Sequence, residues 1–160
     1  MKMQGIITFH GFKLDMMSYE RSDQYDGQDN MELSPDFMLY RIENDLDSSF
    51  FNIVLGVRIG GEDSDLPFNA EAVVRGYFSF NSEESLDYNI DDLQKFTLVN
   101  GSSILFPYLR SILTDITSKS NHNPVILPTI NFTKFIEERD LEEMILSSEY
   151  YEEMEEAHSR

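Results

Sequence analysis

The sequence predicts an α+β fold in which a four-stranded antiparallel sheet is followed by two helices packed on one of its faces. Apolar side chains occupy every second position through much of the first half, and they recur at helical spacing from Leu105 onward. A turn-rich cluster at residues 60–67 separates the two clearest alternating runs, which is typical of a hairpin. A parallel sheet would need helical crossovers between the strands, and none fit there.

The first strand is expected to begin at Ile7. Its alternation of apolar and polar residues changes phase at Gly11, so a bulge is expected there. A second strand is expected over residues 36–43, and both of its faces are apolar. One face carries Phe37 and Leu39, and the other carries Met38, Tyr40 and Ile42.

The third and fourth strands are expected at residues 51–59 and 68–80, where every second residue is apolar or glycine. Such strict alternation indicates one buried face and one exposed face, as in an antiparallel sheet. The outward positions of the fourth strand are Glu71, Val73, Arg75 and Tyr77.

The first helix is expected after an Asn100–Gly101 turn, with a cap at Ser102 or Ser103 and an end at residues 120–124. Residues 90–99 are compatible with a short helix or another loop. The apolar stripe of this helix consists of Leu105, Leu109, Ile112 and Ile116.

A second helix is expected to start near Asn131 or Thr133 and to reach Ile145. Beyond Ser148 the chain is acidic and either continues the helix or frays. We therefore expect one domain over residues 1–148 and an acidic C-terminal tail over residues 149–160.

The charge balance disfavours nucleic acids and anionic membranes as partners. The chain of 160 residues has 12 Lys and Arg against 30 Asp and Glu, a formal net charge of -18 that repels polyanions. It has no cysteine, no run of about 18 apolar residues, and no basic N-terminal region followed by an apolar one. We expect a cytoplasmic protein without membrane insertion.

Motifs for catalysis or for cofactors are not evident. His10, His122 and His158 are far apart and show no ligand spacing, so we expect no metal site. A calcium-loop start at Asp45 fails because Phe50 stands where the loop needs glycine. Phosphate-binding glycine loops and nucleophile elbows are missing, so we expect neither an enzyme nor a cofactor.

Apolar surface is the feature that stands out. Residues 124–132 (PVILPTINF) are apolar and broken by two prolines, so the segment cannot hide all its side chains at once. Two interpretations stay open: these residues pack within the domain or a subunit interface, or they line a groove for extended apolar segments of other chains.

The chain resembles the SecB family of protein-export chaperones. The resemblance is carried by residues 104–110 (ILFPYLR), by the glycine-aromatic sequence at Gly76, and by residues 127–132 (LPTINF). It extends over residues 6–146 and implies a homotetramer, a dimer of dimers, that holds non-native polypeptides in apolar grooves without ATP. The implied groove residues are Leu33, Val125, Leu127, Ile130 and Phe132.

The family's export members also present an acidic sheet face to the SecA motor, and Glu20 and Glu71 fall on such positions. Met16 stands where a further acid of that face is expected. Two functions therefore stay open. One is a general holdase that delivers clients to SecA, and the other is a dedicated partner-binding protein, such as an antitoxin chaperone or a phage or regulatory adaptor, outside export.

Overall fold

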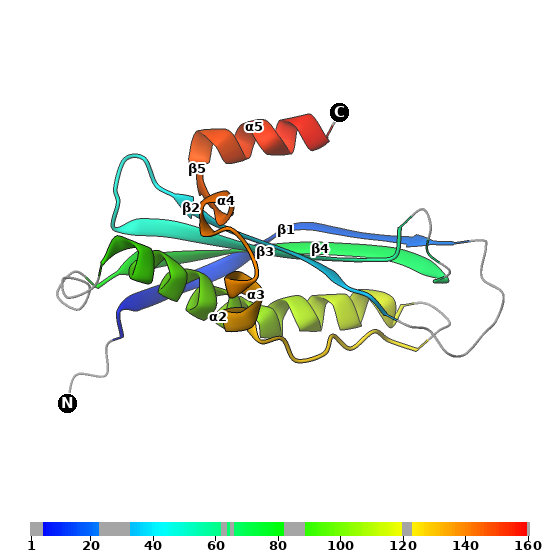
Figure 1. The fold of residues 1–160 in the computed structure, drawn as a ribbon. Coiled ribbons are helices and arrows are strands. Elements are labelled where there is room, and N and C mark those ends of the chain that lie inside the picture. Colours follow the sequence, from blue (N-terminus) through cyan, green and yellow to red (C-terminus); the bar gives the residue numbers. More distant parts are fainter. Residues whose placement is uncertain are drawn as a thin grey trace.

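The computed structural model describes residues 5–22, 33–61, 64, 66–81, 89–119 and 123–159. Figure 1 shows three layers, with the sheet in the middle, a long helix below it and the C-terminal helix above it. The strands of the main sheet are β1 (Ile7–Arg21), β2 (Asp36–Glu43), β3 (Phe50–Ile59) and β4 (Phe68–Phe80).

The sheet has five strands in the order β1-β4-β3-β2-β5. The first four are antiparallel to their neighbours as expected, whereas β5 (Ile145–Ser147) runs parallel to β2. The prediction of a four-stranded, wholly antiparallel sheet was therefore wrong. The chain returns along the free edge of β2 and pairs with it at Arg41–Glu43. No sign of this strand is present in the sequence, because Ile145–Ser147 is too short to show an alternating pattern.

The bulge predicted at Gly11 is confirmed. The register of β1 against β4 shifts between Phe9 and Phe12, and Gly11 has a φ of 112°, which favours glycine. A second shift between Leu14 and Met16 brings Met16 opposite Val73, and the sequence pattern did not predict it.

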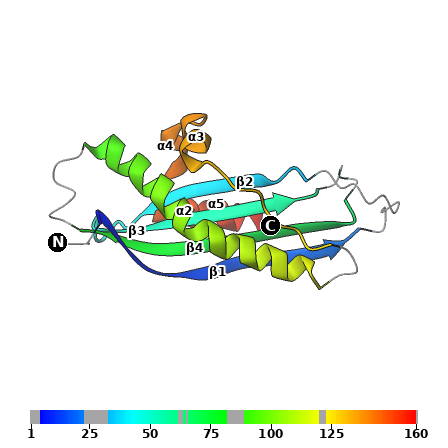
Figure 2. The ribbon, with the colours of Figure 1, turned by 90° about the horizontal axis from the view of Figure 1, so that it is seen from below.

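The long helix α2 (Ile90–Thr117) crosses one face of the sheet diagonally (Figure 2). It begins earlier than predicted, because Asn89 caps it by accepting a hydrogen bond from the Asp92 backbone N–H. Gly101 therefore lies within the helix and not in a turn. A Cβ atom at Gly101 would lie 2.6 Å from Cγ1 of Ile53, so the glycine allows α2 to approach β3 closely.

The core lies between α2 and the sheet. Leu105 and Leu109 of the predicted stripe are completely buried, and Ile112 and Ile116 pack against them at the margin. One charged residue, Arg41, is buried at an end of this layer, with its guanidinium 4.7 Å from the Phe51 ring and 2.8 Å from a Glu43 oxygen. Burial lowers the pKa of Arg41, and the Glu43 carboxylate counteracts that effect.

The predicted second helix is broken into shorter elements. The structure has α3 (Phe132–Glu137), α4 (Leu141–Met144), β5 and then α5 (Ser148–His158). Asn131, Asp140 and Ser147 cap the three helices. These polar caps mark the breaks, which a count of apolar residues overlooks.

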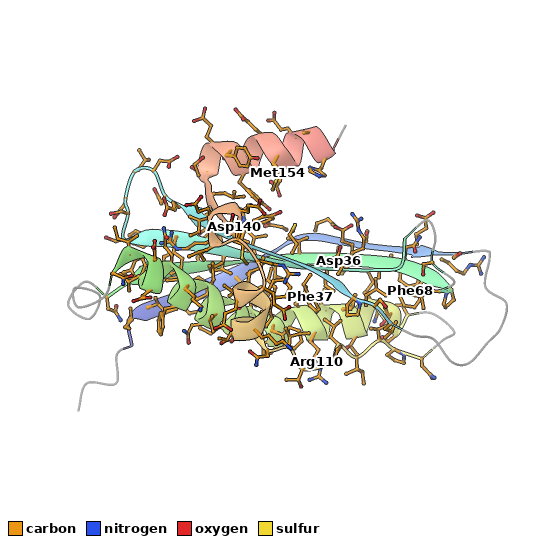
Figure 3. The ribbon with its side chains drawn as sticks, in the orientation of Figure 1. Asp36, Phe37, Phe68, Arg110, Asp140 and Met154 are labelled. Atoms are coloured by element: carbon orange, nitrogen blue, oxygen red, sulfur yellow. The ribbon has the colours of Figure 1, made fainter. Side chains whose placement is uncertain are left out.

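The helices do not all lie on one face, which corrects the prediction. α5 covers the face opposite α2, as Figure 3 shows for Met154 of α5 and Arg110 of α2. A second apolar cluster consisting of Ile42, Val54, Val73 and Tyr151 lies between α5 and the sheet. Because β2 is apolar on both faces, and β4 carries Val73 outward, this face also needs a cover.

Candidate functional site

The connector between α2 and α3 is an extended segment held against α2. The Val125 backbone N–H donates to Oγ1 of Thr117, and Oγ1 of Thr114 donates to the Val125 carbonyl, both at 2.8 Å. Val125 and Leu127 are buried at 2% and 1% exposure, whereas Ile126 between them is 60% exposed. Alternate side chains of the connector therefore face the core and the solvent.

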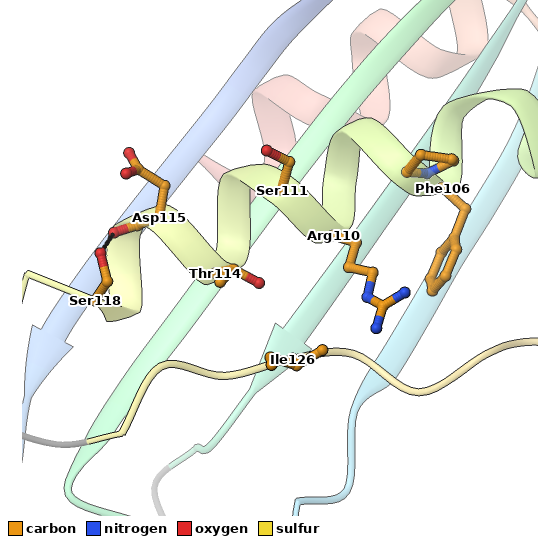
Figure 4. A pocket seen from close by; sticks show the side chains of 8 residues that line it. Phe106, Arg110, Ser111, Thr114, Asp115, Ser118 and Ile126 are labelled. Carbon is orange, nitrogen blue, oxygen red and sulfur yellow. Dashed lines mark hydrogen bonds between the residues drawn. The ribbon is translucent and has the colours of Figure 1, made fainter.

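A trough of about 550 Å³ lies between the connector and the outer side of α2 (Figure 4). Ile126 forms one wall, and one edge of the helix forms the other. The polar side chains that line the trough can donate hydrogen bonds to the backbone of a bound segment or accept hydrogen bonds from it. The lining residues are Phe106, Pro107, Arg110, Ser111, Thr114, Asp115, Ser118 and Ile126.

A cluster of four phenylalanines adjoins the trough through Phe106. The Phe106 ring lies 5.7 Å from Phe132 and 6.3 Å from Phe37, and Phe135 lies 6.4 Å from Phe37. Phe132 is buried, and the other three are half-buried. Arg139 lies over the Phe135 ring at 3.4 Å. The cluster thus presents aromatic surface where β2, α2 and α3 meet.

The edge of β2 beside this cluster is open. Over the part of the chain that the structure describes, Asp36–Tyr40 pair with β3 on one side, and pairing with β5 on the other side begins at Arg41. An unpaired strand edge can accept an extended peptide as an added strand. The trough, the phenylalanine cluster and this edge together form the candidate site.

The residues assigned to the groove from the sequence are not among those that line the trough. Val125, Leu127 and Phe132 belong to the core, and Leu33 and Ile130 are half-buried against it. Sequence reasoning left Ile126 and Phe106 out of the groove set. The alternation of an extended connector could have identified Ile126, since its neighbours on both sides point the other way.

The two acids of the expected docking face do lie on one face of the sheet. Ser18 pairs with Glu71, and Glu20 pairs with Asn69, so Glu20 and Glu71 are two residues apart along the β1–β4 ladder. Glu71 lies 3.7 Å from Arg58. This face is the one that carries α5, and Met16 packs beneath that helix.

The described residues hold no group of three or more His, Cys, Asp and Glu side chains that could bind a metal ion. Within the same residues, none of the helices is both long enough and apolar enough to cross a bilayer. The candidate site offers apolar contact from Phe106 and Ile126, together with the charged side chains of Arg110 and Asp115.

The chain is similar to a known protein family and to several known proteins. The family model described as preprotein translocase subunit SecB matches residues 17–143. A protein of Methanocaldococcus jannaschii, MJ0357, is 38% identical over 74 residues, which are 44% of each chain. Protein-export protein SecB of Anaplasma phagocytophilum is 28% identical over 92 residues, 57% of each chain. The chain thus spans about half the length of these curated relatives.

A solved structure shares the fold. The SecB-like chaperone Rv1957 of Mycobacterium tuberculosis, in complex with a ChAD peptide from the Rv1956 HigA1 antitoxin, matches with a TM-score of 0.62. The match has 15% sequence identity and covers 78% of this chain and 90% of that one. At this identity the likeness concerns the fold.

Proposed function

This chain belongs to the SecB family, and we propose that it binds non-native polypeptides in the trough between α2 and the connector and prevents their aggregation without ATP. The observation that carries the proposal is the exposed Ile126 beside half-buried Phe106, with the open edge of β2 nearby. Val125, Leu127 and Phe132 then support the groove from beneath, and Leu33 and Ile130 border it.

The proposed binding follows from surface burial. A client segment that covers apolar groove surface gains roughly 25 cal/mol per Å², less the cost of ordering the segment. The β2 edge offers backbone hydrogen bonds that do not depend on the client's side chains. Binding of this kind tolerates many client sequences.

We propose further that the protein acts as a cytoplasmic homotetramer. Large apolar side chains remain exposed on the edge strand β1 and on α2, where copies of the chain could meet: Leu14 at 44%, Met17 at 49% and Tyr108 at 40%. Several grooves on one oligomer would bind one client together and strengthen weak contacts.

Light scattering of two unrelated unfolding proteins tests the holdase proposal. We expect the wild type to suppress the aggregation of both at near-stoichiometric oligomer. Ile126→Asp should weaken client binding about tenfold or more, because the carboxylate must be desolvated in the groove. Leu46→Asp is the matched control, since Leu46 is 98% exposed and lies outside the lining of the trough. Equal loss in both variants, or no suppression by the wild type, contradicts the proposal.

A dedicated partner-binding protein is the second candidate. The observation in its favour is that α5 covers part of the sheet face that carries Glu71, the face that docking to SecA would use. The solved structural relative in complex with an antitoxin peptide offers a precedent on the same fold. Suppression of the aggregation of one partner alone would favour this candidate over general holding.

Docking to SecA is tested separately by titrating purified SecA into the protein. If Glu20 and Glu71 form the docking face, Glu71→Lys abolishes SecA binding and leaves client capture unchanged. Glu142→Lys on α4 controls for the change in net charge, because Glu142 is exposed on another element. An unchanged affinity for SecA in Glu71→Lys removes the assignment.

A further inference from the structure

Among the described residues that line the trough, Arg110 of α2 is the one with a positive charge. Its side chain is exposed, and Figure 4 shows the guanidinium directed from the helix toward the connector that carries Ile126. Asp115 also lines the trough, but its carboxylate points away from the connector in the same view and lies 3.4 Å from Nζ of Lys119. The trough therefore combines apolar walls with a positive charge.

Arg110 has no partner of its own, although the chain is rich in acids. Over the part of the chain that the structure describes, every other lysine and arginine has an interaction partner, such as a carboxylate or an aromatic ring. Within the same residues, Arg110 forms no ion pair, ring contact or side-chain hydrogen bond. Its guanidinium is therefore free to bind a carboxylate of another molecule through two parallel hydrogen bonds.

The spacing along α2 determines the pattern that a bound segment needs. Phe106 and Arg110 are four residues apart, so they share one side of the helix and are separated by about 6 Å along its axis. In an extended chain, side chains two residues apart point the same way and are separated by about 7 Å. A segment that lies along α2 therefore places one side chain against Phe106 and the side chain two positions away against Arg110.

We propose that the trough selects extended client segments in which an aspartate or glutamate stands two positions from a large apolar residue. The apolar side chain packs on Phe106 and Ile126, and Arg110 donates hydrogen bonds to the carboxylate. The proposal rests on the proposed holding activity and adds the chemical class of the segment that is held. The preference is opposite to the one that net charge alone produces, because a chain of net charge -18 attracts basic segments and repels acidic ones.

A set of short peptides tests the proposal, with affinities measured by fluorescence anisotropy. The peptides are N-acetylated and C-terminally amidated, so they carry no terminal carboxylate. They share one apolar-rich sequence and differ only at the position two after a phenylalanine, which holds glutamate, glutamine or lysine. The wild type should bind the glutamate peptide about fivefold more tightly than the glutamine peptide, and the lysine peptide least tightly. A glutamate placed directly after the phenylalanine should give no such gain, because adjacent side chains point in opposite directions.

Arg110→Gln removes the positive charge from the trough, and Arg58→Gln is the matched control. Arg58 is an exposed arginine of β3 that lies 3.7 Å from Glu71 and is not in the lining of the trough. The preference for the glutamate peptide over the glutamine peptide should disappear in Arg110→Gln and remain about fivefold in Arg58→Gln. Arg110→Glu should reverse the order and favour the lysine peptide. Far-UV circular dichroism checks that the variants are folded.

Failure of this selectivity and failure of the holding activity give different results. If the glutamine peptide binds and Ile126→Asp weakens its binding, but the wild type binds the glutamate peptide no more tightly, the selectivity is refuted and the holding activity is retained. Equal loss of the preference in Arg58→Gln and Arg110→Gln, or an equal gain from the adjacent glutamate, has the same meaning. If no peptide binds, or if Ile126→Asp leaves the binding of the glutamine peptide unchanged, the trough is not the client site and both proposals are refuted.

Discussion

Leu127 and Ile126 are neighbours in the chain, yet their side chains face the core and the solvent, so replacing each with alanine separates folding from binding. Leu127→Ala removes three buried carbon atoms, worth about 2.4 kcal/mol of transfer free energy. The cavity left behind brings the loss of unfolding free energy to about 3–5 kcal/mol, because Leu127 is 1% exposed. Ile126 is 60% exposed, and Ile126→Ala should cost about 1 kcal/mol or less.

Urea unfolding followed by far-UV circular dichroism measures both variants at one fixed protein concentration, because oligomerisation adds to apparent stability. Aggregation suppression is measured in the same preparations at a temperature where both are folded. We expect Leu127→Ala to lower the unfolding midpoint and to retain client binding. Ile126→Ala should retain the midpoint and bind clients more weakly.

The reverse pattern would refute this assignment of the two side chains. If Leu127→Ala left the midpoint unchanged and reduced client binding, Leu127 would be reachable by clients, as the family resemblance implied. Replacing Val125, Leu127 and Ile130 together with serine should, on the present structure, unfold the protein and not merely empty the groove.

Three further predictions concern stability. Burial raises the pKa of Tyr151 above 10.0, so the stabilisation from docked α5 is fully present below pH 10 and falls by up to about 1.4 kcal/mol per pH unit above it. Tyr151→Phe should abolish this dependence of the urea midpoint on pH, and persistence of the dependence would contradict the assignment. Gly101→Ala should lower the free energy of unfolding in urea by about 1 kcal/mol, because the clash of the added methyl group with Ile53 outweighs the gain in helix propensity. A stabilised variant would show that α2 can shift away from β3 at little cost. Glu43→Gln should lower the free energy of unfolding by about 1–3 kcal/mol in the same assay, because it leaves the buried Arg41 without its carboxylate partner. An unchanged midpoint would show that the Arg41–Glu43 pair does not contribute to stability.

Much of the fold was predictable because its signals are local. The alternation in β3 and β4 and the helical spacing after Leu105 come from residues that share one face of one element. The phase change at Gly11 similarly marks a bulge within one strand. Membership of the SecB family was also predictable from short local motifs, and the match of the SecB family model to residues 17–143 confirms it.

The candidate site was predictable only in part. The sequence identified the connector as unusual, but its apolar content does not tell which side chains point inward. The hydrogen bonds of Val125 with Thr114 and Thr117 orient the segment, and their partners lie 11 and 8 residues away in the chain. With that orientation Ile126 faces the solvent and Leu127 the core.

The sequence by itself therefore determined the order and type of β1–β4 and the long helix that follows them, and the apolar character of both faces of β2. The tertiary structure decided what covers each face. β5 joins the edge of β2 through backbone hydrogen bonds that are largely indifferent to side-chain type, and an acidic C-terminal segment becomes a docked helix because Met16, Met38 and Val73 gather beneath it from three separate strands. Burial of this kind depends on contacts between distant residues, which no local pattern contains.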